Sequence, residues 1–132
     1  MRYVLLYILS FMAFMAIDMV WLGTMTSRFY RPKLQGMLRP TPIWAVAVGF
    51  YLVYVVGVLV LVVLPAHDAG EVWKAVVYGA LLGLVAYGTY DLTNLSAVKG
   101  FPAVVAVVDL IWGTVLTSAT AAIGYFVARW LL

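Results

Sequence analysis

Residues 75–95 read AVVYGALLGLVAYGTYDLTNL. The first half is apolar and carries Gly79 and Gly83 four residues apart, a spacing that lets two membrane helices approach closely. The second half holds the carboxylate of Asp91, an amide, two hydroxyls and two phenols. About 20 apolar residues are enough to cross the hydrocarbon core of a bilayer as a helix. A charged side chain at that depth is costly, so Asp91 is by default a candidate functional residue.

The composition of the whole chain indicates an integral membrane protein. Of 132 residues, 67% are hydrophobic and 10% charged, and the mean hydropathy is +1.10. A water-soluble domain carries about 25% charged residues. The long, uniform apolar runs favour helices over a barrel. The chain has no cysteine, which excludes disulfides and thiolate metal sites, and its net charge of +3 is concentrated in one loop. We interpret the role of this charge as setting the orientation in the membrane and contacting lipid head groups, and we expect no nucleic-acid partner.

We predict an all-α integral membrane protein whose four transmembrane helices form a compact bundle in a single domain, residues 1–132. The spans are expected at about 3–26, 42–64, 72–95 and 102–130. The first apolar run is too long for a cleaved signal peptide and is read as a retained anchor. Pro42 suits the first turn of the second span, and Pro65 is expected to stop it. The basic loop 27–41 is expected to form a short interfacial helix.

The distribution of cations predicts the orientation. The first and third loops hold five of the eight Lys and Arg residues, which favours a cytoplasmic basic loop and both termini outside. Asp18, Asp91 and Asp109 each lie eight to ten residues from a cation on that side. At a rise of about 1.5 Å per residue, the three carboxylates fall in one layer, about 12 to 15 Å from the cationic edge.

This acidic layer is the predicted site. Three acids in one layer repel unless a cation, proton or ligand is present, although a purely structural hydrogen-bond network is the alternative. The candidate residues for binding a ligand or an ion are Asp18, Asp91, Asp109, Asn94, Thr93, Tyr87, Tyr90, Trp21 and Trp112. The aromatic members could contact an organic cation or simply fill space. An Asp-x-x-Trp pattern occurs in both outer spans, at Asp18 and at Asp109.

Other residues are assigned to packing or to head groups. The candidates for close helix packing are Gly79, Gly83, Gly88 and Gly113. The candidates for head-group or phosphate contact are Arg28, Arg31, Lys33 and Arg39, whose simplest role is topology and attraction to anionic lipid. The single histidine, His67, beside Asp68 and Glu71, is too weak a signal for a metal site. No catalytic residue is identified, and no cofactor is evident.

Several motifs resemble those of the domain-of-unknown-function family 2177 of small bacterial membrane proteins. They are Asp18-Met19-Val20-Trp21-Leu22-Gly23, Phe29-Tyr30-Arg31, Phe50-Tyr51 with Tyr54, Ala86-Tyr87-Gly88-Thr89-Tyr90-Asp91-Leu92-Thr93-Asn94, Lys99-Gly100 with Pro102, and Val108-Asp109-Leu110-Ile111-Trp112-Gly113. The resemblance covers nearly the whole chain. It implies a four-helix, multi-pass protein of the bacterial inner membrane, and implies no activity.

Three functions remain open from the sequence. The preferred hypothesis is a small transporter or channel-like protein, as a homo-oligomer, for a cation or a cation-coupled small molecule. The alternative is a membrane-embedded enzyme acting on a lipid or phosphorylated lipid, whose aspartates would hold Mg²⁺ while Arg28, Arg31 and Lys33 hold a phosphate. The third is a non-catalytic assembly subunit in the lipid bilayer.

Overall fold

A computed structural model describes residues 1–132, and it is built from helices alone. α1 (Arg2–Met25) continues through a π-helical segment, η1 (Thr26–Tyr30), into α2 (Arg31–Lys33). α3 (Trp44–Val58) continues through a second π-helical segment, η2 (Leu59–Val63), into α4 (Leu64–Ala69). α5 (Val72–Ala97) and α6 (Ala103–Leu131) complete the chain. Four continuous helices are therefore long and apolar enough to cross a membrane, as predicted.

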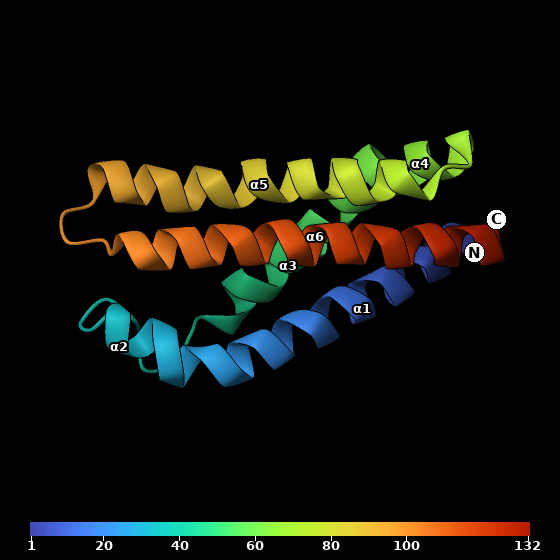
Figure 1. Ribbon diagram of the computed structural model, residues 1–132. Helices are drawn as coiled ribbons and strands as arrows, with labels where there is room; N and C mark the ends of the chain where they lie inside the picture. Colours follow the sequence, from blue (N-terminus) through green and yellow to red (C-terminus); the bar gives the residue numbers. More distant parts are fainter.

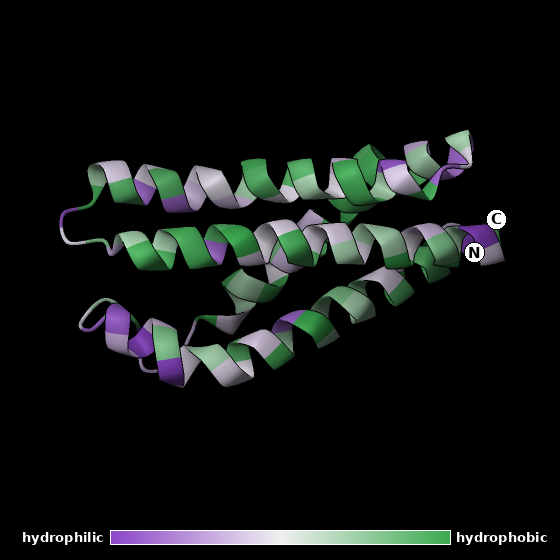
Figure 2. Ribbon diagram, in the orientation of Figure 1, coloured by the Kyte–Doolittle hydropathy of each residue, from purple (hydrophilic) through white to green (hydrophobic).

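The arrangement of these helices gives the bundle two different ends. α5 and α6 lie antiparallel and side by side along their whole length, while α1 crosses them obliquely (Figure 1). Both termini lie at one end, and the basic loop and the α5–α6 turn lie at the other (Figure 1). Apolar residues cover most of the long helices, and hydrophilic residues gather around α2 (Figure 2). The basic loop is therefore on the same side of the bundle as the α5–α6 turn.

Pro65 does not end the second long helix, contrary to the expectation from the sequence. A proline inside a helix cannot donate its hydrogen bond, and its ring clashes with the carbonyl four residues earlier. Here the turn before it widens to π geometry, in which the Leu64 N–H bonds to the Leu59 carbonyl. Helix α4 then ends at Gly70, which adopts the left-handed conformation (φ 69°, ψ 25°). The π segment gives the helix the room to continue past the proline.

The first long helix repeats this solution. η1 directly precedes Arg31 and Pro32, and the Arg31 N–H bonds to the Thr26 carbonyl. The predicted separate interfacial helix is therefore absent, because the first residues of the basic loop extend α1 as far as Lys33. The chain then turns, and the buried side chain of Leu34 holds the turn against the bundle. Pro42 also precedes the second span, which begins at Trp44.

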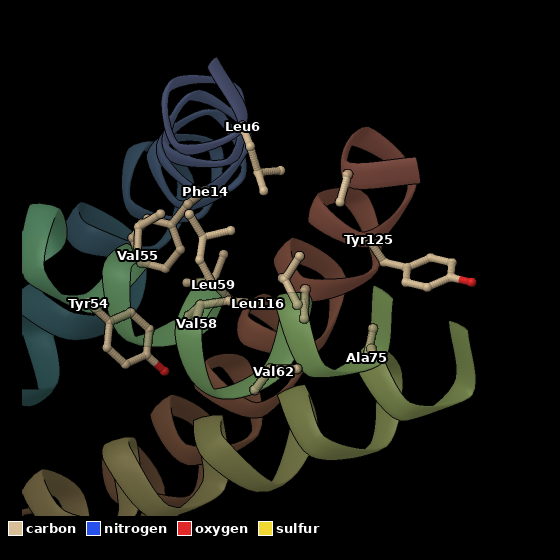
Figure 3. Close-up of a cluster of buried hydrophobic side chains, with 14 residues drawn as sticks. Leu6, Phe14, Tyr54, Val55, Val58, Leu59, Val62, Ala75, Leu116 and Tyr125 are labelled. Atoms are coloured by element: carbon tan, nitrogen blue, oxygen red, sulfur yellow. The ribbon is translucent and has the colours of Figure 1, made fainter. Parts of the chain in front are cut away.

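The hydrophobic core lies between α1, the α3–η2 helix and α6. Figure 3 shows Leu6 and Phe14 of α1 facing Val55, Leu59 and other side chains of that core cluster. Two interhelical hydrogen bonds support it. The Tyr7 hydroxyl donates to the Leu52 carbonyl at 2.7 Å, and the hydroxyls of Tyr54 and Thr117 are bonded at 2.8 Å. The core thus ties α3 to both α1 and α6.

The α5–α6 pair is packed through its glycines. A Cβ on Gly79 would lie 2.9 Å from the Cβ of Ala121, and one on Gly83 would overlap the Gly113 carbonyl oxygen. The ring of Tyr87 lies on Gly113 itself, and Gly88 is looser, with Leu110 3.5 Å from its Cβ position. The glycine spacing of α5 is therefore occupied within the chain by α6. This close contact turns the Asp91 side of α5 toward α6.

Candidate functional site

A partly open cavity of about 480 Å³ lies at the basic-loop end of the bundle. Sixteen residues line it: two are aspartates, one is a threonine, and the other thirteen are hydrophobic residues that include five tyrosines. The lining residues come from all four long helices, the basic loop and the α5–α6 turn. They are Leu22, Thr26, Tyr30, Leu34, Leu38, Ala47, Phe50, Tyr51, Tyr54, Ala86, Tyr87, Tyr90, Asp91, Phe101, Val105 and Asp109. Its volume is in the range of small-molecule sites.

At the level of the cavity, α3 and α5 stand apart from each other. These helices meet mainly through η2 and α4, at the end away from the basic loop. Phe50 of α3 and Tyr90 of α5 both line the cavity and are also 56% and 51% exposed on the outer surface of the bundle. Both helices are long and apolar enough to cross a membrane, so these two exposed rings lie on the part of the surface that a bilayer would cover.

Asp91 and Asp109 form the polar wall of the cavity. Asp91 is 1% exposed, and its Oδ2 atom has no hydrogen-bond partner. The two carboxyl groups lie within interaction distance of each other, on the facing sides of α5 and α6. Asp109 accepts a hydrogen bond of 2.8 Å from the hydroxyl of Tyr30, in η1. Two carboxylates this close repel unless a proton or a cation lies between them.

Asp18 belongs to a second polar cluster beside the cavity. It is 4% exposed, does not line the cavity, and accepts a 3.1 Å hydrogen bond from the indole Nε1 of Trp112. Trp112 stacks on Trp21, with ring centroids 4.3 Å apart and planes 6° apart. The Nε1 of Trp21 in turn donates to the Tyr30 hydroxyl at 3.0 Å. Tyr51 lies between the two clusters, lining the cavity and approaching the Asp18 carboxyl.

The repeated Asp-x-x-Trp pattern thus has a structural counterpart. On antiparallel helices, the tryptophan of α6 binds the aspartate of α1, and the tryptophan of α1 reaches the aspartate of α6 through Tyr30. We call these five residues, Asp18, Trp21, Tyr30, Asp109 and Trp112, the tryptophan clasp. The clasp joins α1 to α6 at the level of the acidic pair.

Some of the remaining predicted binding residues line a cavity in the structure, and others do not. Tyr87 and Tyr90 line the cavity, whereas Trp21 and Trp112 lie outside it. Asn94 lines a smaller neighbouring cavity of about 160 Å³ under the basic loop, and Thr93 is on the outer surface. Of the three predicted aspartates, the structure thus brings Asp91 and Asp109 into the cavity wall, and it places Asp18 outside the cavity, bonded to Trp112 in the clasp.

Sequence reasoning missed three cavity tyrosines, namely Tyr30, Tyr51 and Tyr54. Tyr51 and Tyr54 are the polar side chains of an otherwise apolar span, three residues apart and therefore on one helix face. This spacing was the signal that could have identified them. Tyr30 carried no such signal, because only the continuation of α1 through η1 brings it beneath Asp109.

The basic residues do not join the acidic pair. Arg28, Arg31, Lys33 and Arg39 are exposed, and none lines either cavity. No group of three histidine, cysteine or carboxylate side chains is close enough to hold a metal ion. The arrangement offers a buried carboxyl pair in an aromatic cavity, with the cations of the basic loop exposed outside it.

Comparison with known proteins agrees with the fold. No curated protein and no solved structure gives a significant match. One family matches over residues 3–126, and it is described as "Predicted membrane protein (DUF2177)". That match includes most or all of each of the four long helices, both aspartates of the cavity and the whole clasp. The chain therefore belongs to the DUF2177 family of membrane proteins.

Proposed function

We propose that this protein is a small transporter that binds a cation, or a small molecule coupled to a cation, between Asp91 and Asp109. The observation that carries the proposal is the carboxyl pair in the wall of a 480 Å³ cavity, with the Asp91 Oδ2 atom unpaired. A buried acceptor without a partner is costly in an apolar surrounding, and a bound cation would satisfy it.

The position of the cavity supports transport rather than a purely structural role. It lies toward one end of the bundle, while the other end is filled by core side chains such as Leu6, Val63 and Ala128. A protein that alternates its access needs an open and a closed side. The π segment η1 contributes Thr26 and Tyr30 to the cavity wall, and such segments are frequent at functional sites.

The setting of this function is part of the proposal. The family resemblance implies the bacterial inner membrane as its location. The excess of cations on the basic-loop side favours an orientation with that loop in the cytoplasm and both termini outside. The cavity would then open from the cytoplasmic half of the membrane. A homo-oligomer remains part of the proposal, with an interface other than the Gly79 and Gly83 face, which α6 already covers.

The enzyme alternative has less support. It requires a phosphate-binding group beside the acidic pair, and the exposed Arg28, Arg31, Lys33 and Arg39 lie outside the cavity. A divalent ion held by two carboxylates would also need further oxygen ligands, and the cavity wall around Asp91 is mostly aromatic.

The test is flux in proteoliposomes. Purified protein is reconstituted with a pH-sensitive or cation-sensitive dye inside the vesicles, and a panel of inorganic and organic cations is applied outside. We expect protein-dependent flux for at least one cation and a loss of about tenfold or more in Asp91→Asn. Asp68→Asn is the matched control, because Asp68 is exposed in α4, away from the cavity. Flux that is absent, or that survives unchanged in Asp91→Asn, contradicts the proposal.

A further inference from the structure

The lining of the cavity restricts which cation it suits. Seven of the sixteen lining residues are aromatic: Tyr30, Tyr51, Tyr54, Tyr87, Tyr90, Phe50 and Phe101. A dehydrated inorganic ion needs several oxygen ligands arranged around it. Of the five phenol oxygens in the lining, two are engaged, that of Tyr30 with Asp109 and that of Tyr54 with Thr117. Among the fully buried side-chain oxygens of the wall, Oδ2 of Asp91 has no hydrogen-bond partner. The lining therefore presents mainly ring faces around one acidic wall.

From this geometry we infer that the cavity binds an amphipathic organic monocation, an amine with an apolar body. The charged end would lie against Asp91 and Asp109, and the apolar body would lie among the aromatic rings. Aromatic faces attract cations and also cover apolar surface. The inference names the ligand class of the proposed function and rests on the same two carboxyl groups.

The charge of the site agrees with a monocation. Asp91 and Asp109 face each other from α5 and α6, and no Lys or Arg lines the cavity. With one proton shared between the two carboxyl groups, the pair carries a single negative charge, which one ammonium group balances.

The separation of α3 and α5 at the cavity agrees with the apolar part of such a ligand. Phe50 and Tyr90 line the cavity from these two helices and are about half exposed, on the surface that a bilayer would cover. An amphipathic amine partitions into the bilayer, with its charged group at the interface and its carbon skeleton among the chains. The ligand would therefore reach the acidic pair laterally, without crossing the exposed cations of the basic loop.

The test measures binding, not flux. Protein in lipid nanodiscs is titrated calorimetrically with phenylbutylammonium, with phenylbutanol as the neutral analogue of the same skeleton, and with sodium ion. Protein-free nanodiscs give the partitioning background. We expect saturable binding of the ammonium compound at least about tenfold tighter than the alcohol, and a loss of about tenfold or more in Asp91→Asn.

A second variant keeps the test decisive if Asp91→Asn does not fold. Ala47→Trp fills the cavity from α3 without changing a charge, and we expect it to abolish ammonium binding. Ala45→Trp is its control, because Ala45 lies two residues away on the exposed surface of α3 and does not line the cavity. This control is expected to bind like the unchanged protein.

The outcomes separate this inference from the proposed function. Equal binding of the alcohol, binding of sodium alone, or ammonium binding that survives in Ala47→Trp overturns the ligand class. Cation flux in proteoliposomes without ammonium binding would leave the transporter standing and overturn the inference. Ammonium binding that depends on Asp91 without any flux would support the inference and contradict transport.

Discussion

The two halves of the bundle solve the same problem of membrane packing in different ways. Toward the termini, α5 and α6 touch through glycines, and the space between α1, η2 and α6 is filled by side chains such as Leu6, Val63 and Ala128. Toward the basic loop, α3 parts from α5, and aromatic rings surround a cavity in place of a filled core. We refer to these as the packed half and the cavity half.

The difference indicates which half of the bundle stabilises the fold and which half holds the candidate site. In the packed half, backbone approaches backbone, so that dispersion contacts are dense and rigid. In the cavity half, α1 and α6 are joined by polar side chains through the tryptophan clasp, and the space beside the clasp stays open. A substitution should therefore affect folding more in the packed half and ligand binding more in the cavity half.

The largest effect on stability is expected at Gly83. Its added methyl group in Gly83→Ala would overlap the backbone carbonyl of Gly113, which cannot move away without shifting α6. We expect the free energy of unfolding to fall by about 3 kcal/mol, the upper range for overpacking. Unfolding of the purified protein in detergent micelles measures this loss.

The control for Gly83 is another helical glycine. Nothing lies within 4 Å of the Cβ position of Gly57 in α3, so Gly57→Ala should be neutral or slightly stabilising. Equal stability of the Gly83 and Gly57 variants would show that the packed half does not depend on close helix approach.

The next effect is expected at Gly113, where the two halves meet. A methyl group in Gly113→Ala would overlap the ring of Tyr87, a side chain that can swing into the cavity. We therefore expect a smaller loss of stability, about 2 kcal/mol, together with a loss of phenylbutylammonium binding. The measurements are detergent unfolding and nanodisc calorimetry on the same variant.

A second substitution checks the cause. If Tyr87 is the obstacle, Tyr87→Leu should cost less stability in the Gly113→Ala background than in the unchanged protein. Additive losses would show that the strain at Gly113 is not relieved through the cavity.

The sequence was sufficient for the fold because the relevant physics is local. Apolar runs of membrane length predicted four helices, and the spacing of Gly79 and Gly83 marked a face for close approach. It was insufficient at the prolines. Pro65 was read as a stop, and the continuation depends on a widened turn that the packing of η2 on α6 and α5 stabilises. No local propensity reports such a turn.

The site could be predicted in part from the sequence, again because part of the relevant physics is local. Depth along a helix can be counted, and this placed Asp18, Asp91 and Asp109 in one layer. The rotation of each helix about its own axis does not follow from residue number. That rotation turns Asp91 and Asp109 into the cavity and turns Asp18 toward Trp112. Tyr30 stood in a motif of the resembled family, but its place at the site could not be predicted, because it depends on the extension of α1 past residue 26.

A third prediction concerns the tryptophan clasp of the cavity half. Trp112→Phe removes the donor to Asp18, and Trp21→Phe removes the donor to Tyr30. Each loss of an internal hydrogen bond in a membrane bundle costs about 0.6 to 2 kcal/mol. Because the two rings also stack, we expect the double variant to lose less than the sum of the single losses, by about 0.5 to 1 kcal/mol. A double-mutant cycle in detergent unfolding measures the coupling. Additive losses would mean that the two Asp-x-x-Trp motifs act independently.

The smallest effect distinguishes two threonines in the packed half that sit three residues apart on α6 and are both fully buried. Thr117 is hydrogen-bonded to Tyr54, whereas the Thr120 hydroxyl has no partner. Thr117→Val should therefore destabilise the protein by about 1 kcal/mol, and leave the Tyr54 hydroxyl unpaired. Thr120→Val removes an unsatisfied group and keeps the shape, so it should be neutral or slightly stabilising. The measurement is unfolding of the Thr117→Val and Thr120→Val variants in detergent micelles. Equal losses of stability would show that the Thr120 hydroxyl has a hydrogen-bond partner in the folded protein. In that case the packed half would depend on polar contacts much as the cavity half does.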